Sequence, residues 1–160
     1  MNFGTIRIYD SGAAWSTLNP APGTYNWGPL DSWLNLAEAH GADVLYTFGR
    51  TPKWAISGTC SGGYAPYGCA QTPASMTEWD DFVRAIDTHA AGRIKYGEMW
   101  NEPNETAVSW AGGIPTLVTM TQHARAIIKS IDPNAVIVSP GTDKNTPTAS
   151  YCNQVLGVNC

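Results

Sequence analysis

The chain has 160 residues, of which 43% are hydrophobic and 14% charged, and its formal net charge is −4. This length suffices for one compact domain with a core of its own. The chain carries no Lys/Arg cluster and no apolar run near the roughly 20 residues that cross a bilayer, which argues against nucleic acid and membranes as partners.

The first half of the chain alternates between strand and helix patterns. Residues 4–10 (GTIRIYD) are rich in β-branched side chains and predict a strand. Residues 29–41 place apolar side chains on one helical face and finish with Gly41, which predicts a helix with a glycine stop. Residues 43–49 (DVLYTFG) predict a second strand.

Residues 75–92 carry the clearest helix pattern. Apolar side chains recur there at i, i+3, i+4 and i+7, counted from Trp79. Ser75 and Glu78 have the spacing of a capping box, in which each side chain accepts a hydrogen bond from the other residue's backbone N–H. We therefore predict a helix that begins directly after Ser75.

The rest of the chain continues the alternation, with a strand over 93–100, a helix over 115–132 and a strand over 135–139. Strands that are joined by helical crossovers run parallel. The expected fold class is therefore α/β, with about four parallel strands and three crossover helices.

Two architectures share this element order, a doubly wound sheet and a (β/α)8 TIM barrel. The turn after the first strand reads DSGAAWSTLNP, which lacks the G-x-G-x-x-G fingerprint of a nucleotide-binding sheet. Segments that follow strands are long and segments that follow helices are short, as in barrel enzymes. We predict that residues 1–160 form a single, partial (β/α)8 barrel domain.

Polar and aromatic residues gather directly after the predicted strands, where the carboxyl ends of parallel strands meet at one edge of the sheet. They include Asp10, Trp15, Arg50, Trp54, Asn101, Glu102 and Asp143. Seven Trp and seven Tyr stand out in a chain of this length. Since aromatic rings stack on the apolar C–H faces of sugars, Trp15, Trp54 and Trp110 are candidate substrate-binding platforms, with core packing as the alternative.

The stretch 94–106 (IKYGEMWNEPNET) holds the best candidate for catalysis. Glu102 lies where the third strand ends, beside Trp100, whose ring could exclude water. In a regular strand Asn101 would point to the opposite face. It joins Glu102 only if the strand ends or bulges there, which Pro103 favours by removing a backbone donor.

Glu98 lies deeper in the same strand. Because buried charges in proteins are paired, we expect Glu98 to be a structural carboxylate that is bound by Arg7 or Arg50.

The four cysteines form two close pairs in sequence, Cys60/Cys69 and Cys152/Cys160. Their spacing does not fit zinc, and neither a metal nor another cofactor is expected. Of the three possible connectivities, the two local bridges are favoured because short loops close easily. An even number of cysteines in loops suggests a secreted protein. No signal peptide is present, so we expect that it was removed or that the chain was cut from a longer one.

W-N-E-P-N at 100–104 resembles the acid/base signature of clan-A glycoside hydrolases, which are retaining (β/α)8 enzymes. With R-I-Y-D at 7–10, T-F-G-R-T-P-K-W-A at 47–55 and I-D-P-N-A-V-I-V-S-P-G at 131–141, the chain is similar to family-39-like members over residues 3–141. The resemblance implies an enzyme that hydrolyses O-glycosidic bonds of a β-linked poly- or oligosaccharide without a cofactor.

The resemblance also implies residue roles. Glu102 matches the general acid/base, Asn101 the residue that binds the sugar 2-hydroxyl, and Arg7 a basic residue that supports the catalytic carboxylates. In such enzymes R-I-Y-D belongs to the second barrel strand and W-N-E-P to the fourth, while the nucleophilic glutamate follows the seventh. This chain is therefore expected to hold barrel strands two to five and to lack the nucleophile.

Three interpretations remain open at this point. The chain is an incomplete glycoside hydrolase, a carbohydrate-binding remnant without catalysis, or a half-barrel that works only when its open sheet edges are covered by self-association. Among the other acidic residues on the expected rim, Asp10 and Asp143 could replace the nucleophile, although neither matches the family pattern.

Overall fold

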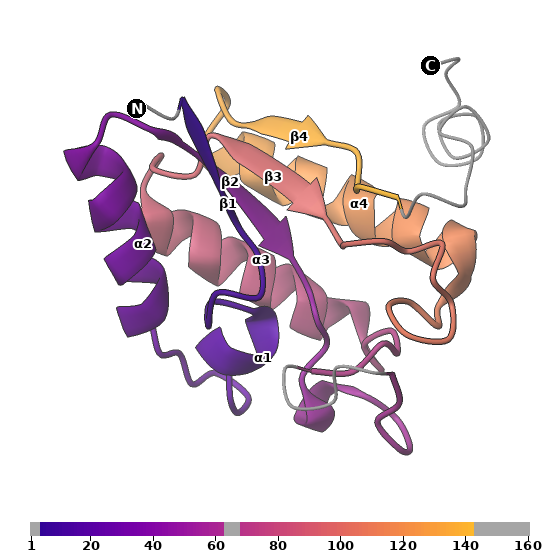
Figure 1. Ribbon diagram of the computed structural model, residues 1–160. Coiled ribbons are helices and arrows are strands. Elements are labelled where there is room, and N and C mark those ends of the chain that lie inside the picture. Colours follow the sequence, from indigo (N-terminus) through magenta and orange to yellow (C-terminus); the bar gives the residue numbers. More distant parts are fainter. Residues whose placement is uncertain (1–3, 63–67, 143–160) are drawn as a thin grey trace, which may run out of the picture.

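The computed structural model describes residues 4–62 and 68–142, which form an α/β fold (Figure 1). The elements in chain order are β1 (Thr5–Ile8), α1 (Trp15–Leu18), α2 (Gly28–Ala39), β2 (Asp43–Phe48), η1 (Lys53–Ala55), α3 (Met76–Ala90), β3 (Tyr96–Met99), α4 (Gly113–Ile131) and β4 (Val136–Val138). All seven expected strands and helices are present, with bounds within three residues of the expected ones. The short helices α1 and η1 were not anticipated.

The four strands form one sheet in the order β1-β2-β3-β4, and every neighbouring pair is parallel. This arrangement confirms the expected partial barrel. In the register, Thr47 of β2 lies opposite Glu98 of β3, which in turn lies opposite Val138 of β4. These three residues therefore share a row across the sheet near the carboxyl ends of its strands.

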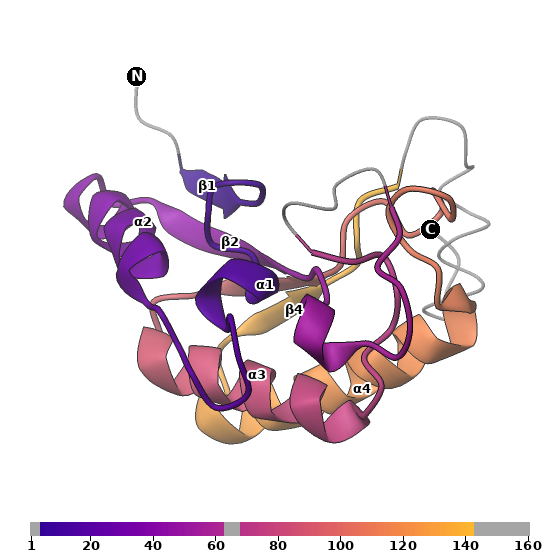
Figure 2. The same cartoon turned by 90° about the horizontal axis from the view of Figure 1, so that it is seen from below.

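The two faces of the sheet differ. Helices α2, α3 and α4 cover one face (Figure 2), and the side chains that point to them, such as Tyr46 and Phe48, are buried. Phe48 packs edge-on against Trp79 and Phe82 of α3. Among the described residues no helix covers the opposite face, which carries the alternate residues, among them Arg7 and Glu98. In a closed barrel that face is the interior.

The start and the end of α3 follow from local chemistry. The Ser75 hydroxyl accepts a hydrogen bond from Thr77 N at 3.2 Å, which confirms the predicted N-cap. The reciprocal half of the capping box does not form, because Glu78 Oε2 has no hydrogen-bond partner among residues 4–62 and 68–142. At the other end Ala91 takes a left-handed conformation with φ 52°, and Gly92 follows with φ 81°.

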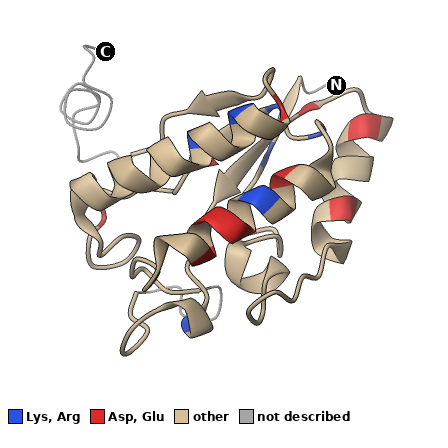
Figure 3. Ribbon diagram, turned by 180° about the vertical axis from the view of Figure 1, so that it is seen from behind, with Lys and Arg blue, Asp and Glu red and all other residues tan. Residues whose placement is uncertain are grey.

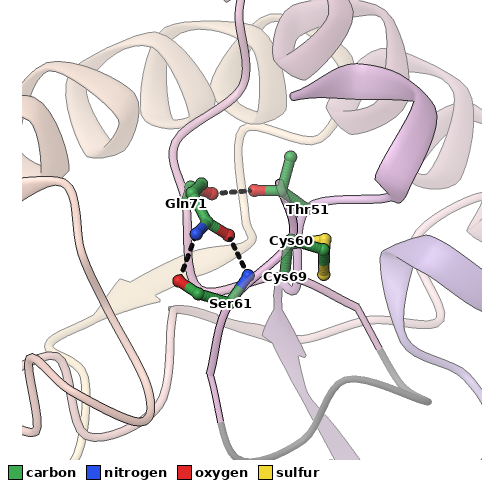
Figure 4. The surroundings of a disulfide bond; sticks show 5 residues. All are labelled: Thr51, Cys60, Ser61, Cys69 and Gln71. Carbon is green, nitrogen blue, oxygen red and sulfur yellow. Dashed lines mark hydrogen bonds between the residues drawn. A yellow bond between two sulfur atoms is a disulfide. The ribbon is translucent and has the colours of Figure 1, made fainter. Parts of the chain in front are cut away.

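One of the two expected disulfides is present. Cys60 and Cys69 are bonded in the loop between β2 and α3 (Figure 4). Next to this bridge the Gln71 side chain accepts from Ser61 N at 3.1 Å and donates to the Ser61 hydroxyl, and Thr51 Oγ1 donates to Gln71 O at 2.6 Å. The loop is thus tied covalently and by side chains. Cys152 and Cys160 lie outside the described residues, as does Asp143.

No helix in the described part of the chain is both long and apolar enough to cross a membrane. Over the same residues no group of three or more His, Cys, Asp or Glu side chains is placed to hold a metal ion.

Asp87 of α3 is a buried carboxyl group that lowers the stability of the fold at neutral pH. Asp87 is 4% exposed, and its Oδ2 has no hydrogen-bond partner in the described residues. Burial, and secondly the charge of Asp132, raises the pKa of Asp87 from 3.8 to about 6. A raised carboxyl pKa in the folded state means that ionisation opposes folding, so this destabilisation begins above pH 3.8 and is complete above about pH 6.

Replacing Asp87 with Asn should raise the free energy of unfolding by about 1–3 kcal/mol near neutral pH, because the uncharged amide needs no buried ionisation. The gain should shrink towards zero at about pH 4, where the aspartate itself is mostly protonated in the folded protein. Thermal denaturation of both proteins across this range measures the effect, with Asp81→Asn, an exposed carboxylate of the same helix, as control. A gain of equal size at both ends of the range would contradict the argument.

Candidate active site

A buried carboxylate, Glu98, organises the carboxyl end of the sheet. Its side chain is 7% exposed. Oε2 accepts hydrogen bonds from Arg7 Nε at 2.8 Å, Arg7 Nη2 at 2.6 Å and Thr47 Oγ1 at 2.5 Å. Oε1 accepts from Gly141 N at 3.0 Å. This confirms the expected pairing of Glu98 with Arg7, while Arg50 donates to the Tyr9 hydroxyl at 2.8 Å.

The donors to Glu98 come from three different parts of the chain. Arg7 lies on β1, Thr47 on β2, and Gly141 follows β4. An ionised carboxylate that leaves water loses several kcal/mol of solvation, which only full pairing offsets. The position of Glu98 on β3 therefore depends on the other three strands being in register.

Asn101 joins this network because β3 ends early. The strand finishes at Met99, and Trp100 has a left-handed φ of 75°, which breaks the alternation of side chains. Arg7 Nη2 consequently donates to Asn101 Oδ1 at 2.8 Å. Since this contact turns Oδ1 towards the guanidinium group, the Asn101 Nδ2 hydrogens point elsewhere and can serve a ligand.

Glu102 is held by its backbone and not by its carboxylate. Its N–H donates to Gly141 O at 2.9 Å, and its φ of 47° is again left-handed. Two left-handed residues other than glycine within three positions concentrate backbone strain here, as is common at functional sites. The side chain is half-buried, and among residues 4–62 and 68–142 its carboxylate has no hydrogen-bond or ion-pair partner. We use the name rim site for Arg7, Glu98, Asn101 and Glu102.

The two carboxylates of the rim site differ in their hydrogen-bond partners. Both oxygens of Glu98 are bound by protein donors, so Glu98 is structural. Glu102 keeps a carboxylate that the fold does not use, at the carboxyl end of a parallel strand, where barrel enzymes build their sites. Such a group can donate or accept a proton.

Two of the three aromatic platforms were predicted wrongly. Trp15 is 0% exposed, stacks on Phe82 with ring centroids 5.1 Å apart and meets Trp79 edge-on. Trp110 is 1% exposed and packs edge-on against Trp100 at 4.7 Å. A fully buried indole offers no face to a sugar. Sequence could not separate the two roles, because a tryptophan in a loop is equally apolar in either.

Trp54 does not lie in the rim site either. It is partly buried, its Nε1 donates to Asn19 O at 2.8 Å, and it lines a pocket on the helical side of the sheet. This too corrects the expectation that Trp54 stands at the catalytic edge.

Sequence reasoning missed Thr47 and Gly141. Thr47 is a buried side chain with a hydroxyl group on β2, and it shares strand parity with Leu45 on the uncovered face. That parity is a signal that could have identified it. Gly141 acts through its backbone N–H and carbonyl, so its side-chain type carried no such signal.

No protein-family model and no curated protein matches the chain significantly. Solved structures do. A GH39 β-xylosidase from Caulobacter crescentus superposes with a TM-score of 0.73 and 22% identity over 97% of this chain and 37% of its own. A GH39 enzyme from Xanthomonas axonopodis pv. citri superposes with a TM-score of 0.73 and 22% identity, over 97% of this chain and 32% of its own. A glucosidase from Croceicoccus marinus superposes with a TM-score of 0.66 and 18% identity, over 88% of this chain and 31% of its own.

These similarities define the fold. The chain is folded as part of an α/β barrel of the kind found in glycosidases, and it spans only 31–37% of the length of these three structures.

Arg7 and Glu98 should be energetically coupled. Arg7→Met and Glu98→Gln should each lower the free energy of unfolding by about 1–3 kcal/mol, the range being modest because the Arg7 side chain is partly exposed. The double variant should lose less than the sum, because Glu98→Gln removes the charge that Arg7→Met leaves unpaired.

Urea denaturation of the four proteins gives the coupling energy. The exposed pair Lys95–Asp43, which is 2.6 Å apart, is the matched control and should show little coupling. Strictly additive losses at Arg7 and Glu98 would contradict the network.

Proposed function

We propose that the chain belongs to a retaining glycoside hydrolase that cleaves O-glycosidic bonds in a β-linked poly- or oligosaccharide, with Glu102 as the general acid/base. The observation that carries the proposal is the free Glu102 carboxylate beside Asn101, at the carboxyl edge of a sheet shared with glycosidases. The name of the Caulobacter crescentus neighbour, a β-xylosidase, favours xylo-oligosaccharides among the substrates.

In the proposed reaction protonated Glu102 gives its proton to the glycosidic oxygen as the bond from that oxygen to the anomeric carbon breaks. A carboxylate nucleophile forms the glycosyl-enzyme, and Glu102 then takes a proton from the water that hydrolyses it. The Asn101 Nδ2 group donates to the sugar 2-hydroxyl, held in place by the Arg7 contact to Oδ1.

The nucleophile must lie about 5 Å from Glu102 in a retaining enzyme. We propose that it comes from outside these 160 residues, since Asp10 is exposed and does not match the family's pattern for the nucleophile, which is a glutamate after the seventh barrel strand. We also propose that the protein is exported, an assignment that the Cys60–Cys69 disulfide supports.

The missing nucleophile can be replaced by a small anion. The chain alone should hydrolyse phenyl β-xyloside negligibly. With azide, which attacks the anomeric carbon as phenol departs with the proton of Glu102, phenol should be released together with xylosyl azide. Glu102→Gln should lower that rate by about 10²-fold.

Three results would contradict this account. Azide-dependent release that is unchanged in Glu102→Gln would remove Glu102 from the acid role. A strong azide-free rate that survives Asp10→Asn but vanishes in Glu102→Gln would show that a nucleophile other than Asp10 is already present. Binding of sugars without any release, even with azide, would favour the non-catalytic carbohydrate-binding interpretation.

Asn101→Ala should weaken binding of xylotriose about tenfold, because one hydrogen bond to the ligand and the orientation that Arg7 imposes are lost. Calorimetric titration measures this, with Asn35→Ala on the exposed face of α2 as control. Equal affinity of the Asn101→Ala variant and the wild type would mean that the amide does not contact the sugar.

A further inference from the structure

A second pocket lies on the helical side of the sheet, away from the rim site. Its volume is about 600 Å³, and it is lined by residues 19–27 after α1, by Trp54 and by one side of α3. Helix α3 covers one face of the sheet (Figure 2), whereas Glu98 belongs to the alternate residues of the other face. All of these lining residues belong to the described part of the chain. We call it the outer pocket.

One wall of the outer pocket is aromatic. Tyr25 stacks on Trp27 with centroids 4.9 Å apart and an angle of 6°. Trp27 stacks on His89 at 4.6 Å and 13°. His89 Nε2 lies 2.7 Å from Asp31 Oδ1, a contact that fixes the imidazole plane. The three rings are therefore nearly parallel, and the contact with Asp31 fixes the orientation of His89.

The α3 side of the outer pocket also carries charged side chains that are unpaired among the described residues. Glu78, Asp81 and Arg84 follow one another at intervals of three residues along α3, whose acidic and basic segments are visible in Figure 3. Among the described residues none of the three forms an ion pair, and Glu78 Oε2 is shielded from solvent without a hydrogen-bond partner. The pKa of Tyr25 is raised, first by burial and then by the negative charge of Asp81.

This combination selects the chemistry of a ligand. Carboxylates that accept and a guanidinium group that donates suit a neutral molecule with many hydroxyl groups, each of which can do both. The charges of opposite sign do not favour a simple anion or cation. The aromatic side chains among the lining residues suit a ligand ring with an apolar face, and the volume lies in the range of small-ligand sites.

We propose that the outer pocket is a non-catalytic binding site for one sugar ring of the polysaccharide on which the rim site acts. The choice of carbohydrate rests on the proposed function, whereas the pocket itself does not. A polymer that is held there keeps neighbouring units near the rim site and raises their effective concentration.

The test uses the 160-residue chain and two probes, xylohexaose and cellohexaose, titrated calorimetrically. Asp81→Ala and Arg84→Ala should each weaken binding of at least one probe about tenfold, because each removes a charged hydrogen-bond partner. Arg125→Ala, an exposed arginine on α4, is the control and should leave this binding event unchanged. Glu78→Gln, which keeps the side-chain shape, should weaken it less.

The absence of heat with both probes, or affinities that Asp81→Ala and Arg84→Ala leave unchanged, would overturn the outer pocket as a sugar site. The azide-dependent release of phenol separates the two proposals, since a monomeric glycoside needs only the rim site. If phenol release depends on Glu102 but the Asp81 and Arg84 variants bind the probes like the wild type, the proposed function is supported and the outer pocket is not a sugar site. If those variants abolish binding of the probes but no phenol is released, the outer pocket is supported as a sugar site and the proposed function is contradicted.

Discussion

The pairing of the buried Glu98 carboxylate is the interaction on which the rest of the sheet edge depends. Its donors come from β1, from β2 and from the segment after β4, so one charge on β3 ties together the carboxyl ends of the four strands. A buried charge tolerates no missing partner. A shift of one strand by one residue would turn either Arg7 or Thr47 to the covered face of the sheet, so the pairing penalises register errors.

Glu98 acts on the proposed chemistry through Arg7. The same guanidinium group that binds Glu98 also binds Asn101 Oδ1, and Asn101 O accepts from Ser109 Oγ at 2.8 Å. Ser109 is in turn held through its carbonyl by Trp100 Nε1. Asn101 is therefore fixed both by its side chain and by its backbone before any ligand arrives, which is the preorganisation that a substrate-binding amide needs.

The sequence allowed the order of elements, the parallel sheet, the gathering of polar residues at one edge, the Arg7–Glu98 pair and the Cys60–Cys69 bridge to be predicted. These features follow from hydrophobic periodicity, from crossover rules and from the need to pair a buried charge. The position of Asn101 could be predicted only conditionally. It depends on the left-handed Trp100, and no local propensity favours that conformation in a tryptophan.

The tryptophans show why the aromatic platforms could not be predicted. Six of the seven donate the indole N–H to another residue, and five of these six acceptors are backbone carbonyls: Ser11, Asn19, Ser109, Gly113 and Met120. Most of those carbonyls belong to segments that follow strands. Such loops bury few apolar groups of their own, and a tryptophan supplies both apolar area and a donor that satisfies a loop carbonyl.

A high tryptophan content in this chain therefore serves first to anchor the loops that carry the rim site. Aromatic rings that remain partly exposed are the ones that could stack on a ligand, and among those described, Tyr25, Trp27 and Trp54 gather around the outer pocket. Composition suggested that aromatic rings bind sugar at the catalytic edge. The packing favours instead a proposed catalytic edge that works through polar contacts supported by buried indoles. A loop that holds Trp100 and Glu102 in left-handed conformations needs rigid support more than it needs another platform.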